Sequence, residues 1–256
     1  MIKFCSLSSG SKGNTAFIEV NGDKYLIDIG NTALYVEKNL HDIGIEPKDI
    51  KGIFISHYHR DHIDGLKVFI KRYNPTVYLS NQTYSELSKT IEIVNYVLFD
   101  NIEFIDFNVT LIPTSHDASG SYGFIFDDGC ENEIVYVTDT GYLSEKNLKL
   151  MANKKLYYFE SNHDIELLMN GSYPYYLKQR ILGDKGHLSN KSSAYYLHSI
   201  IGSKTKTIIL AHLSEENNRP DIALNELLTT LSNYNQTVDN ILIGKQNERG
   251  EMIEIC

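Results

Sequence analysis

The sequence predicts an α/β fold in which two β-sheets pack together and are covered by helices. Three observations lead to this prediction. Short runs rich in β-branched residues recur along the 256 residues, amphipathic stretches are interleaved with them, and the strand-like runs outnumber the helical ones. A simple doubly wound sheet would not show this excess of strands, so two packed sheets fit the pattern better.

The predicted strands are short apolar runs bounded by turn residues. They cover 16–20, 24–28, 52–56, 76–79, 104–107, 109–113, 122–126, 133–138, 156–159, 205–211 and 240–243. The predicted helices are amphipathic and cover 33–43, 65–73, 143–153, 191–201 and 220–234. Pro220 suits a first helical turn, where its missing N–H costs nothing. No low-complexity tract, linker or repeat marks a boundary, so we expect one domain over 1–256.

Composition and charge narrow the classes of function. A net charge of −9 argues against broad, non-specific nucleic-acid binding, although metal-site carboxylates inflate the acidic count. The chain shows no signal peptide and no apolar run that could span a bilayer. Its three cysteines are scattered and form no Cys-x-x-Cys pair. We therefore expect a soluble, cytoplasmic protein that does not bind membranes.

A dense group of metal-ligand side chains follows the predicted strand 52–56. The six residues are His57, Tyr58, His59, Arg60, Asp61 and His62. Imidazole and carboxylate suit zinc, manganese or iron. One ion cannot take all four ligands from so short a loop, so we expect His57 and His59 to face one ion. Asp61 and His62 would face another. A chance run of surface residues is the alternative, and the density of ligands at one strand end disfavours it.

Three more potential ligands also follow strand-like runs. They are His116, Asp139 and His212. Parallel strands deliver their ends to one edge of a sheet, so we expect these side chains to converge with the motif. Asp139 is the natural bridge between two ions, because a carboxylate can span two ions and an imidazole normally cannot. Taken alone, His116 or His212 would more often be an ordinary histidine.

The pattern His-x-His-x-Asp-His with a later His, Asp and His resembles the metallo-β-lactamase superfamily across essentially the whole chain. This resemblance implies a four-layer αββα sandwich with a two-metal site at one edge. It implies two ligand sets, which are His57, His59 and His116 for one ion and Asp61, His62 and His212 for the other, bridged by Asp139. Asp28 is similar to the family carboxylate that supports the ligands, although it could simply be a turn residue before Gly30.

Four further stretches resemble a narrower family, the bacterial YycJ (WalJ) proteins, which implies a 5′-to-3′ exonuclease acting on DNA. The stretches are 7–14, 160–164, 185–190 and 211–218. Glu160 and His187 are similar to the proton relay of tRNA-processing members of the superfamily. A phosphodiester releases a poor alkoxide, so we expect His187 to donate a proton or bind phosphate while Glu160 orients it. A buried structural pair is the alternative. Asp61 is expected to be catalytic as well as a ligand.

Two segments could contact a nucleic-acid substrate. The loop 8–14 could present N–H groups to a phosphate, although it lacks P-loop spacing and can equally be a plain turn. The segment 173–180 mixes aromatic and basic residues that could stack on bases, although aromatic residues at such spacing are more often core. The candidate side chains are Ser11, Lys12, Asn14, Tyr175, Lys178 and Arg180.

These observations favour a phosphodiesterase that acts on nucleic acid, a 5′-to-3′ DNA exonuclease, with two Zn²⁺ or Mn²⁺ ions and a bridging hydroxide as nucleophile. A phosphodiesterase for a small cyclic phosphate is the alternative. Thioester or lactam hydrolysis is a third alternative, of which lactam hydrolysis is disfavoured because the chain shows no signal peptide and no cysteine in a ligand position. Di-iron redox chemistry is disfavoured because such relatives carry Glu in place of His59. A metal-free binding domain ranks last, since all seven ligand positions hold competent side chains. The chain has no room for a large inserted cap domain.

Overall fold

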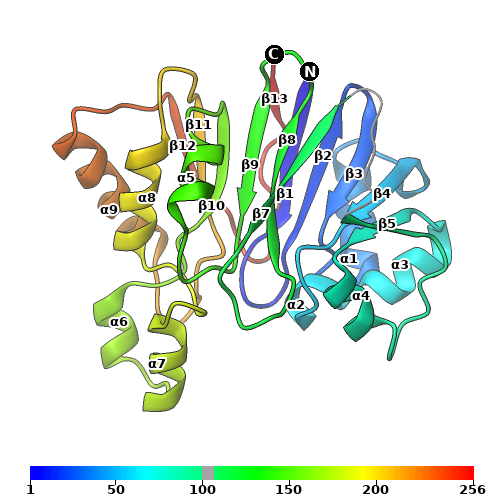
Figure 1. Cartoon of the computed structure of the whole chain (residues 1–256), viewed down its shortest axis with the longest axis horizontal. Helices are drawn as coiled ribbons and strands as arrows, with labels where there is room; N and C mark the ends of the chain where they lie inside the picture. Colours follow the sequence, from blue (N-terminus) through cyan, green and yellow to red (C-terminus); the bar gives the residue numbers. More distant parts are fainter. Residues whose placement is uncertain (100–106) are drawn as a thin grey trace.

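Two β-sheets lie face to face at the centre of the molecule, and helices cover the outer face of each sheet (Figure 1). The computed structural model describes residues 1–99 and 107–256. The four layers of helix, sheet, sheet and helix are the αββα sandwich that the sequence predicts. Both chain termini lie together at one edge of the sandwich (Figure 1).

The first sheet has the strand order β13-β1-β2-β3-β4-β5-β6. Its strands are β1 (Ile2–Ser8), β2 (Thr15–Val20), β3 (Asp23–Ile27), β4 (Ile50–Phe54), β5 (Thr76–Leu79), β6 (Tyr96–Leu98) and β13 (Ile253–Ile255). Strands β3 to β6 run parallel, whereas β1 pairs antiparallel with β2 and β13. Three of these strands, β1, β6 and β13, were not predicted from the sequence. Two serines make β1 resemble a loop, and β6 and β13 each have only three residues.

The second sheet has the strand order β12-β11-β10-β9-β8-β7. Its strands are β7 (Asn108–Pro113), β8 (Tyr122–Asp127), β9 (Glu133–Val137), β10 (Leu156–Glu160), β11 (Thr207–Ala211) and β12 (Asn240–Ile243). Strands β9 to β12 are parallel, and β8 is antiparallel to both β7 and β9. These two reversals leave β7 running in the same direction as β9. The predicted strand 104–107 lies outside the described residues, apart from Phe107.

Helices flank the two sheets in separate groups. Helices α1 (Ala33–Asp42), α3 (Leu66–Tyr73) and α4 (Asn81–Leu87) cover the first sheet, and α5 (Glu145–Met151), α8 (Asn190–Ile200) and α9 (Pro220–Asn233) cover the second (Figure 1). The 3₁₀ turn η1 (Pro47–Asp49) precedes β4. The short helices α2 (Arg60–Ile63), α6 (Ile165–Asn170) and α7 (Tyr175–Leu182) lie at the edge opposite the termini, where α6 and α7 project from the body.

The five predicted helices are present, with each end within two residues of its predicted position. Helices α2, α4, α6 and α7 were not predicted. They have four to eight residues, and short helices show the 3.6-residue period only weakly, although α3 and α5 are of similar length and were predicted. No helix among the described residues is long and apolar enough to cross a membrane.

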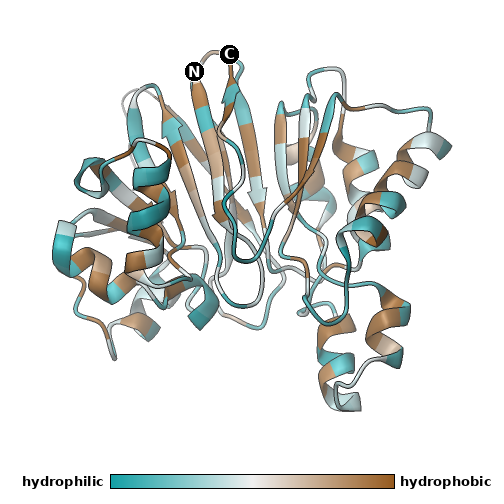
Figure 2. Cartoon of the chain, turned by 180° about the vertical axis from the view of Figure 1, so that it is seen from behind, coloured by the Kyte–Doolittle hydropathy of each residue, from teal (hydrophilic) through white to brown (hydrophobic). Residues whose placement is uncertain are grey.

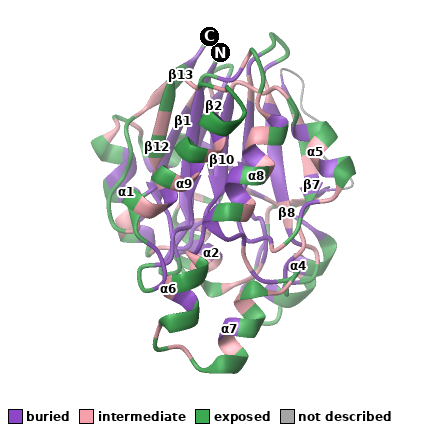
Figure 3. Ribbon diagram, turned by 90° about the vertical axis from the view of Figure 1, so that its left-hand side faces the viewer, coloured by how far each residue is buried: buried purple, intermediate pink, exposed green. Residues whose placement is uncertain are grey.

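Burial on both faces explains the apolar strands. In β9, Ile134 and Tyr136 pack between the sheets, while Val135 and Val137 pack under the helices. A strand covered on both sides is apolar at consecutive positions, and polar residues begin where it ends, as with Thr138 and Asp139 after β9. Figures 2 and 3 show this arrangement, with apolar, buried strands and hydrophilic, exposed outer helix surfaces. The polar residues that follow the strands therefore gather at one edge.

Candidate metal centre

The motif 57–62 lies on the loop that leaves β4 and on the short helix α2. Backbone hydrogen bonds tie this loop to its neighbours, because Asn14 N donates to Asp61 O at 2.7 Å and Ile29 N donates to His62 O at 2.8 Å. The approach is so close that a Cβ on Gly30 would stand 1.6 Å from Asp61 O. Only glycine at position 30 permits this packing, which holds the motif against the end of β3.

Three imidazoles form the first potential ligand group. His57 and His59 come from the motif loop and His116 follows β7, and one ring nitrogen of each lies within 4.8 Å of the others. His59 Nδ1 and His116 Nε2 lie 3.1 Å apart. Burial lowers the pKa of all three imidazoles, most strongly that of His57. They are therefore neutral, which is the state that binds a metal ion.

The second potential ligand group combines Asp61, His62, Asp139 and His212. Asp139 Oδ2 lies 3.1 Å from His62 Nε2 and 3.2 Å from His212 Nδ1. Its other oxygen, Oδ1, lies 3.9 Å from His116 Nε2 of the first group. Asp139 thus faces both groups with one oxygen each, which is the arrangement that a bridging carboxylate needs.

The cluster fits a pair of divalent ions. Donor atoms about 2.0–2.1 Å from one tetrahedral zinc ion stand roughly 3.3 Å apart, close to the spacings seen here. Among the described residues, the buried atoms His57 Nε2, Asp139 Oδ2 and His212 Nδ1 have no hydrogen-bond partner. Asp139 Oδ2 approaches both imidazoles without the angles of a hydrogen bond. Buried polar atoms without partners are costly unless a ligand satisfies them, so these atoms indicate a metal site.

A buried network behind the motif sets the orientation of two ligands. Asp28 Oδ1 accepts from Ser56 N at 2.8 Å, and its Oδ2 lies 2.7 Å from His62 Nδ1. Ser56 Oγ donates to Asp28 and lies 3.0 Å from His57 Nδ1. With both Nδ1 atoms engaged in this way, each Nε2 lone pair points into the cluster. Asp28 thus contacts His62 directly and reaches His57 through Ser56.

Three residues of the site adopt left-handed backbone conformations. The φ angles of Asp28, Asp139 and His212 are 58°, 54° and 55°. Such conformations cost energy in residues other than glycine and cluster at functional sites. His212 is also held at its backbone, since its N–H donates to Ser9 Oγ at 2.8 Å and its carbonyl accepts from Asn162 Nδ2 at 2.9 Å.

Glu160 and His187 form a pair beside the second ligand group. Glu160 Oε1 lies 2.7 Å from His187 Nδ1, and Oε2 accepts from Thr140 N at 2.9 Å. Burial disfavours the charged imidazole, but the carboxylates of Glu160, Asp139 and Asp61 together outweigh burial and raise the pKa of His187 to about 9. His187 Nδ1 is 3.7 Å from Asp139 Oδ1. A protonated imidazole therefore stands next to the residue that faces both ligand groups. His163 is fully buried close to this pair, where the charges of Glu160 and His187 both act on it.

The loop 8–14 meets the site in an unexpected way. Asn14 is fully buried, and its Nδ2 lies 3.1 Å from His62 Nε2 and 3.3 Å from Asp61 Oδ2. It therefore contacts the ligand residues themselves. Lys12 extends outward and pairs with the exposed Glu215. Ser11 is exposed and lines a hollow next to His116.

The segment 173–180 divides into residues with different contacts. Lys178 Nζ donates to the carbonyls of Met169 and Gly171 at 2.7 and 2.8 Å, so this ammonium ties α7 to the end of α6 and faces no substrate. Tyr175 is 70% exposed. Arg180 Nε donates to Asp117 Oδ2 at 2.6 Å. The expectation of a shared substrate surface is thus corrected for Lys178.

Sequence reasoning missed four residues that hold or adjoin the cluster. They are Ser9, Ser56, Asp117 and Asn162. Asp117 Oδ1 lies 3.5 Å from both His59 Nε2 and His116 Nε2. Ser56 directly precedes the motif and Asp117 directly follows the predicted ligand His116, so sequence position could have identified both as site residues. Ser9 and Asn162 lie in the stretches 7–14 and 160–164 that resemble the narrower family, but their roles depend on contacts distant in sequence.

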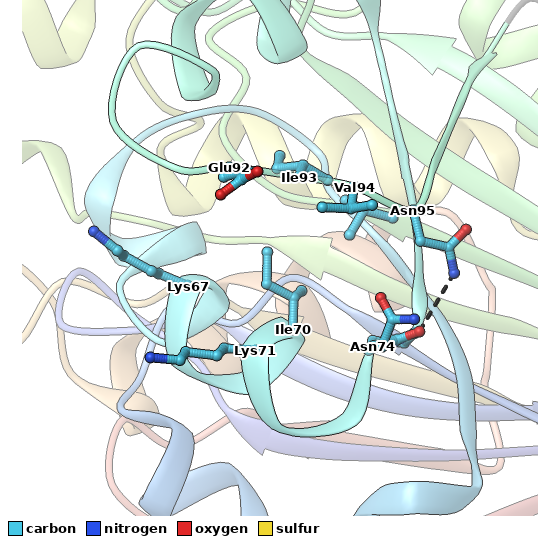
Figure 4. A pocket seen from close by; sticks show the side chains of 10 residues that line it. Lys67, Ile70, Lys71, Asn74, Glu92, Ile93, Val94 and Asn95 are labelled. Carbon is cyan, nitrogen blue, oxygen red and sulfur yellow. Dashed lines mark hydrogen bonds between the residues drawn. The ribbon is translucent and has the colours of Figure 1, made fainter.

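A separate hollow of about 470 Å³ lies between α3 and the segment 91–95 (Figure 4). Lys67 and Lys71 stand on one side, Glu92 and Val94 on the other, and Asn95 Nδ2 donates to the carbonyl of Asn74 at 3.3 Å. None of its described lining residues belongs to the histidine and aspartate cluster. The chemistry of this hollow is therefore distinct from that of the site.

Comparison with known proteins agrees with this geometry. The family model described as the metallo-beta-lactamase superfamily matches residues 9–150. The chain belongs to this superfamily. It is 37% identical over 231 residues to exodeoxyribonuclease WalJ of Streptococcus pneumoniae, covering 86% of this chain and 85% of that protein. It is 33% identical over 228 residues to exodeoxyribonuclease YycJ of Bacillus anthracis, covering 87% and 86%.

Among solved structures, the metallo-beta-lactamase fold protein YhfI from Bacillus subtilis superposes with a TM-score of 0.71. The two chains are 16% identical, and the match covers 97% of this chain and 98% of YhfI, so it supports the fold alone. The predicted superfamily and fold are confirmed, and so is the narrower likeness to YycJ and WalJ. This metallo-β-lactamase-fold chain is a metal-dependent hydrolase.

Proposed function

We propose that this hydrolase is a two-metal phosphodiesterase that degrades DNA from the 5′ end. The two relatives named exodeoxyribonucleases, each similar over most of its length, support the substrate class. The observation that carries the reaction type is the pair of Glu160 and His187 beside Asp139. A phosphodiester leaves as a poor alkoxide, so a protonated imidazole at that point would accelerate its departure.

The two ions would be Zn²⁺ or Mn²⁺, since imidazole and carboxylate suit both. His57, His59 and His116 would hold one, and Asp61, His62 and His212 the other, with Asp139 between them. When bound, such ions activate water and stabilise charge on the phosphoryl oxygens. Protonation of the leaving group would fall to two side chains of the protein. Glu160 holds His187 by Nδ1, which leaves the Nε2 proton free to pass to the leaving oxygen.

The proposed compartment is the cytoplasm. Cys5, Cys130 and Cys256 are all free thiols, and two of them are exposed. Free thiols suit a reducing compartment. We also propose that the whole chain works as one domain, because β1 pairs with β13 and so joins both chain ends in the sheet that carries the motif.

A nuclease assay tests the proposed function. End-labelled single- and double-stranded DNA with 5′-phosphate or 5′-hydroxyl ends would be incubated with the protein and Zn²⁺ or Mn²⁺. Stepwise loss from the 5′ end that disappears in Asp139→Ala is the expected result, and the preferred ion would emerge from it. A protein that holds two ions per chain and leaves every DNA intact would contradict the proposal. Small cyclic phosphodiesters would then be the next substrates to test.

A further inference from the structure

A small hollow adjoins the proposed leaving-group acid. It measures about 260 Å³, and His116 and His187 form its inner end. Its outer end is formed by α7 and the loop that follows. With about 260 Å³ this hollow lies just below the roughly 300–1,000 Å³ of common ligand pockets, so it fits one nucleotide at most.

The wall of the hollow suits a base and a sugar. Tyr173, Leu177 and Ile181 all line it, and each is half-buried. Leu177 and Ile181 are four residues apart on one side of α7, and Tyr173 lies just before this helix. The exposed Tyr175 lies outside this hollow. An aromatic ring with two aliphatic side chains offers a flat, apolar surface that any of the four bases could contact.

The rim of the hollow suits a phosphate. Arg180 and Lys185 line it, and both are exposed. Within the part of the chain that the structure describes, Lys185 forms no ion pair. Arg180 pairs with Asp117, whose side chain is 30% exposed while that of Arg180 is 59% exposed. Exposed ion pairs contribute little stability, so an incoming phosphate can replace the carboxylate. Asp117 would keep its contacts with His59 and His116.

We propose that this hollow binds the 5′-terminal nucleotide of the strand, with its base against α7 and its 5′-phosphate on Arg180. The inference rests on the proposed exonuclease function and adds a reason for its direction. Water adds to the phosphorus that joins the first two nucleotides, and the bond from this phosphorus to the 3′-oxygen of the first nucleotide breaks. His187 gives that oxygen a proton, and the proton lost by the water restores His187.

The polarity follows from the position of the acid. Because His187 lines the hollow, the departing oxygen belongs to whatever occupies the hollow. A single departing nucleotide with a 3′-oxygen is the product of trimming from the 5′ end. Trimming from the 3′ end would instead place the whole remaining strand on this side, and a hollow of about 260 Å³ does not hold it.

Binding of a mononucleotide tests the assignment without catalysis. Mn²⁺-loaded protein would be titrated in a calorimeter with 5′-dAMP and with deoxyadenosine. Arg180→Gln should weaken binding of 5′-dAMP by about tenfold or more and leave deoxyadenosine unchanged, because one charge-assisted contact is lost. Arg219→Gln is the matched control, since Arg219 is an exposed arginine near an aspartate, Asp221, and lies outside the hollow. Equal affinity of Arg180→Gln and the unaltered protein for 5′-dAMP would overturn the assignment.

Two further variants separate this inference from the proposed function. Leu177→Trp fills the hollow and should weaken both ligands while metal content stays the same; unchanged binding of both would overturn it. On DNA, Arg180→Gln should raise the KM for 5′-phosphate ends and not for 5′-hydroxyl ends. A protein that binds 5′-dAMP through Arg180 but leaves DNA intact supports the pocket and contradicts the exonuclease. A protein that degrades DNA without any effect of Arg180→Gln supports the exonuclease and contradicts the pocket.

Discussion

The two sheets contribute to the site in opposite ways. The first sheet supplies four potential ligands from one loop after β4, with a buried network of Asp28 and Ser56 behind them. The second sheet supplies single residues from the ends of β7, β9 and β11, far apart in the chain. The first half of the site is therefore local and recognisable as a motif, whereas the second half exists only because strand direction brings its members together.

Asp139 should have the largest effect, because its two carboxylate oxygens face different ligand groups. We expect Asp139→Ala to reduce binding of both ions and to bring hydrolysis down to background. His57→Ala should reduce binding of one ion only, since His57 belongs to the first group alone. Metal analysis of the purified variants measures this, with the exposed His41→Ala as control. Two ions per chain retained in Asp139→Ala would show that the halves bind independently.

His187 should affect the reaction but not the metals. We expect His187→Gln to lower the rate on DNA by roughly 10²–10⁴-fold, the usual contribution of a general acid. The loss should be much smaller on a nitrophenyl phosphodiester, whose leaving group needs no proton. Rates on the two substrates, compared at equal metal content, decide the role. An equal loss on both would indicate that His187 positions the phosphate instead.

A variant of Asp28 tests how far the ligands in residues 57–62 depend on the buried network behind them. Asp28→Asn preserves the shape of the side chain but removes the charge that holds His62 Nδ1 at 2.7 Å. We expect metal affinity to fall by about 10–100-fold, as is typical when a partner of a histidine ligand is lost. Titration with a competing chelator gives the affinity, and Asp49→Asn on the exposed turn η1 is the control. Unaltered metal affinity would mean that His62 is correctly oriented without the charge of Asp28.

Ser9 offers the smallest and most specific test, because this residue of the first half supports a ligand of the second. Ser9→Ala removes the acceptor of the buried His212 N–H. The free energy of unfolding should fall by about 1–3 kcal/mol, the cost of leaving one buried donor unsatisfied. Metal affinity should fall less than in Asp28→Asn. Denaturant unfolding gives the stability, with the exposed Ser88→Ala as control; identical midpoints would show that His212 is held without Ser9.

Much of the fold and the first half of the site could be predicted from the sequence. Buried strands and amphipathic helices leave periodic patterns, and ligands crowded into residues 57–62 need no tertiary contact to be noticed. Strands without this pattern were not predicted. One example is β1, which contains two serines. The predicted convergence of His116 rested on parallel strands, yet β7 reaches the common edge through two antiparallel pairings.

What the tertiary structure alone decided is the set of contacts between residues distant in sequence. The sequence cannot show that Ser9 holds His212, that Asn14 lies against His62, or that Lys178 turns inward to the end of α6. Nor can it show that Arg180 reaches Asp117 across a hollow beside the acid. A side chain's residue type limits which partners it can take, but its actual partner depends on which loops the packed sheets bring together.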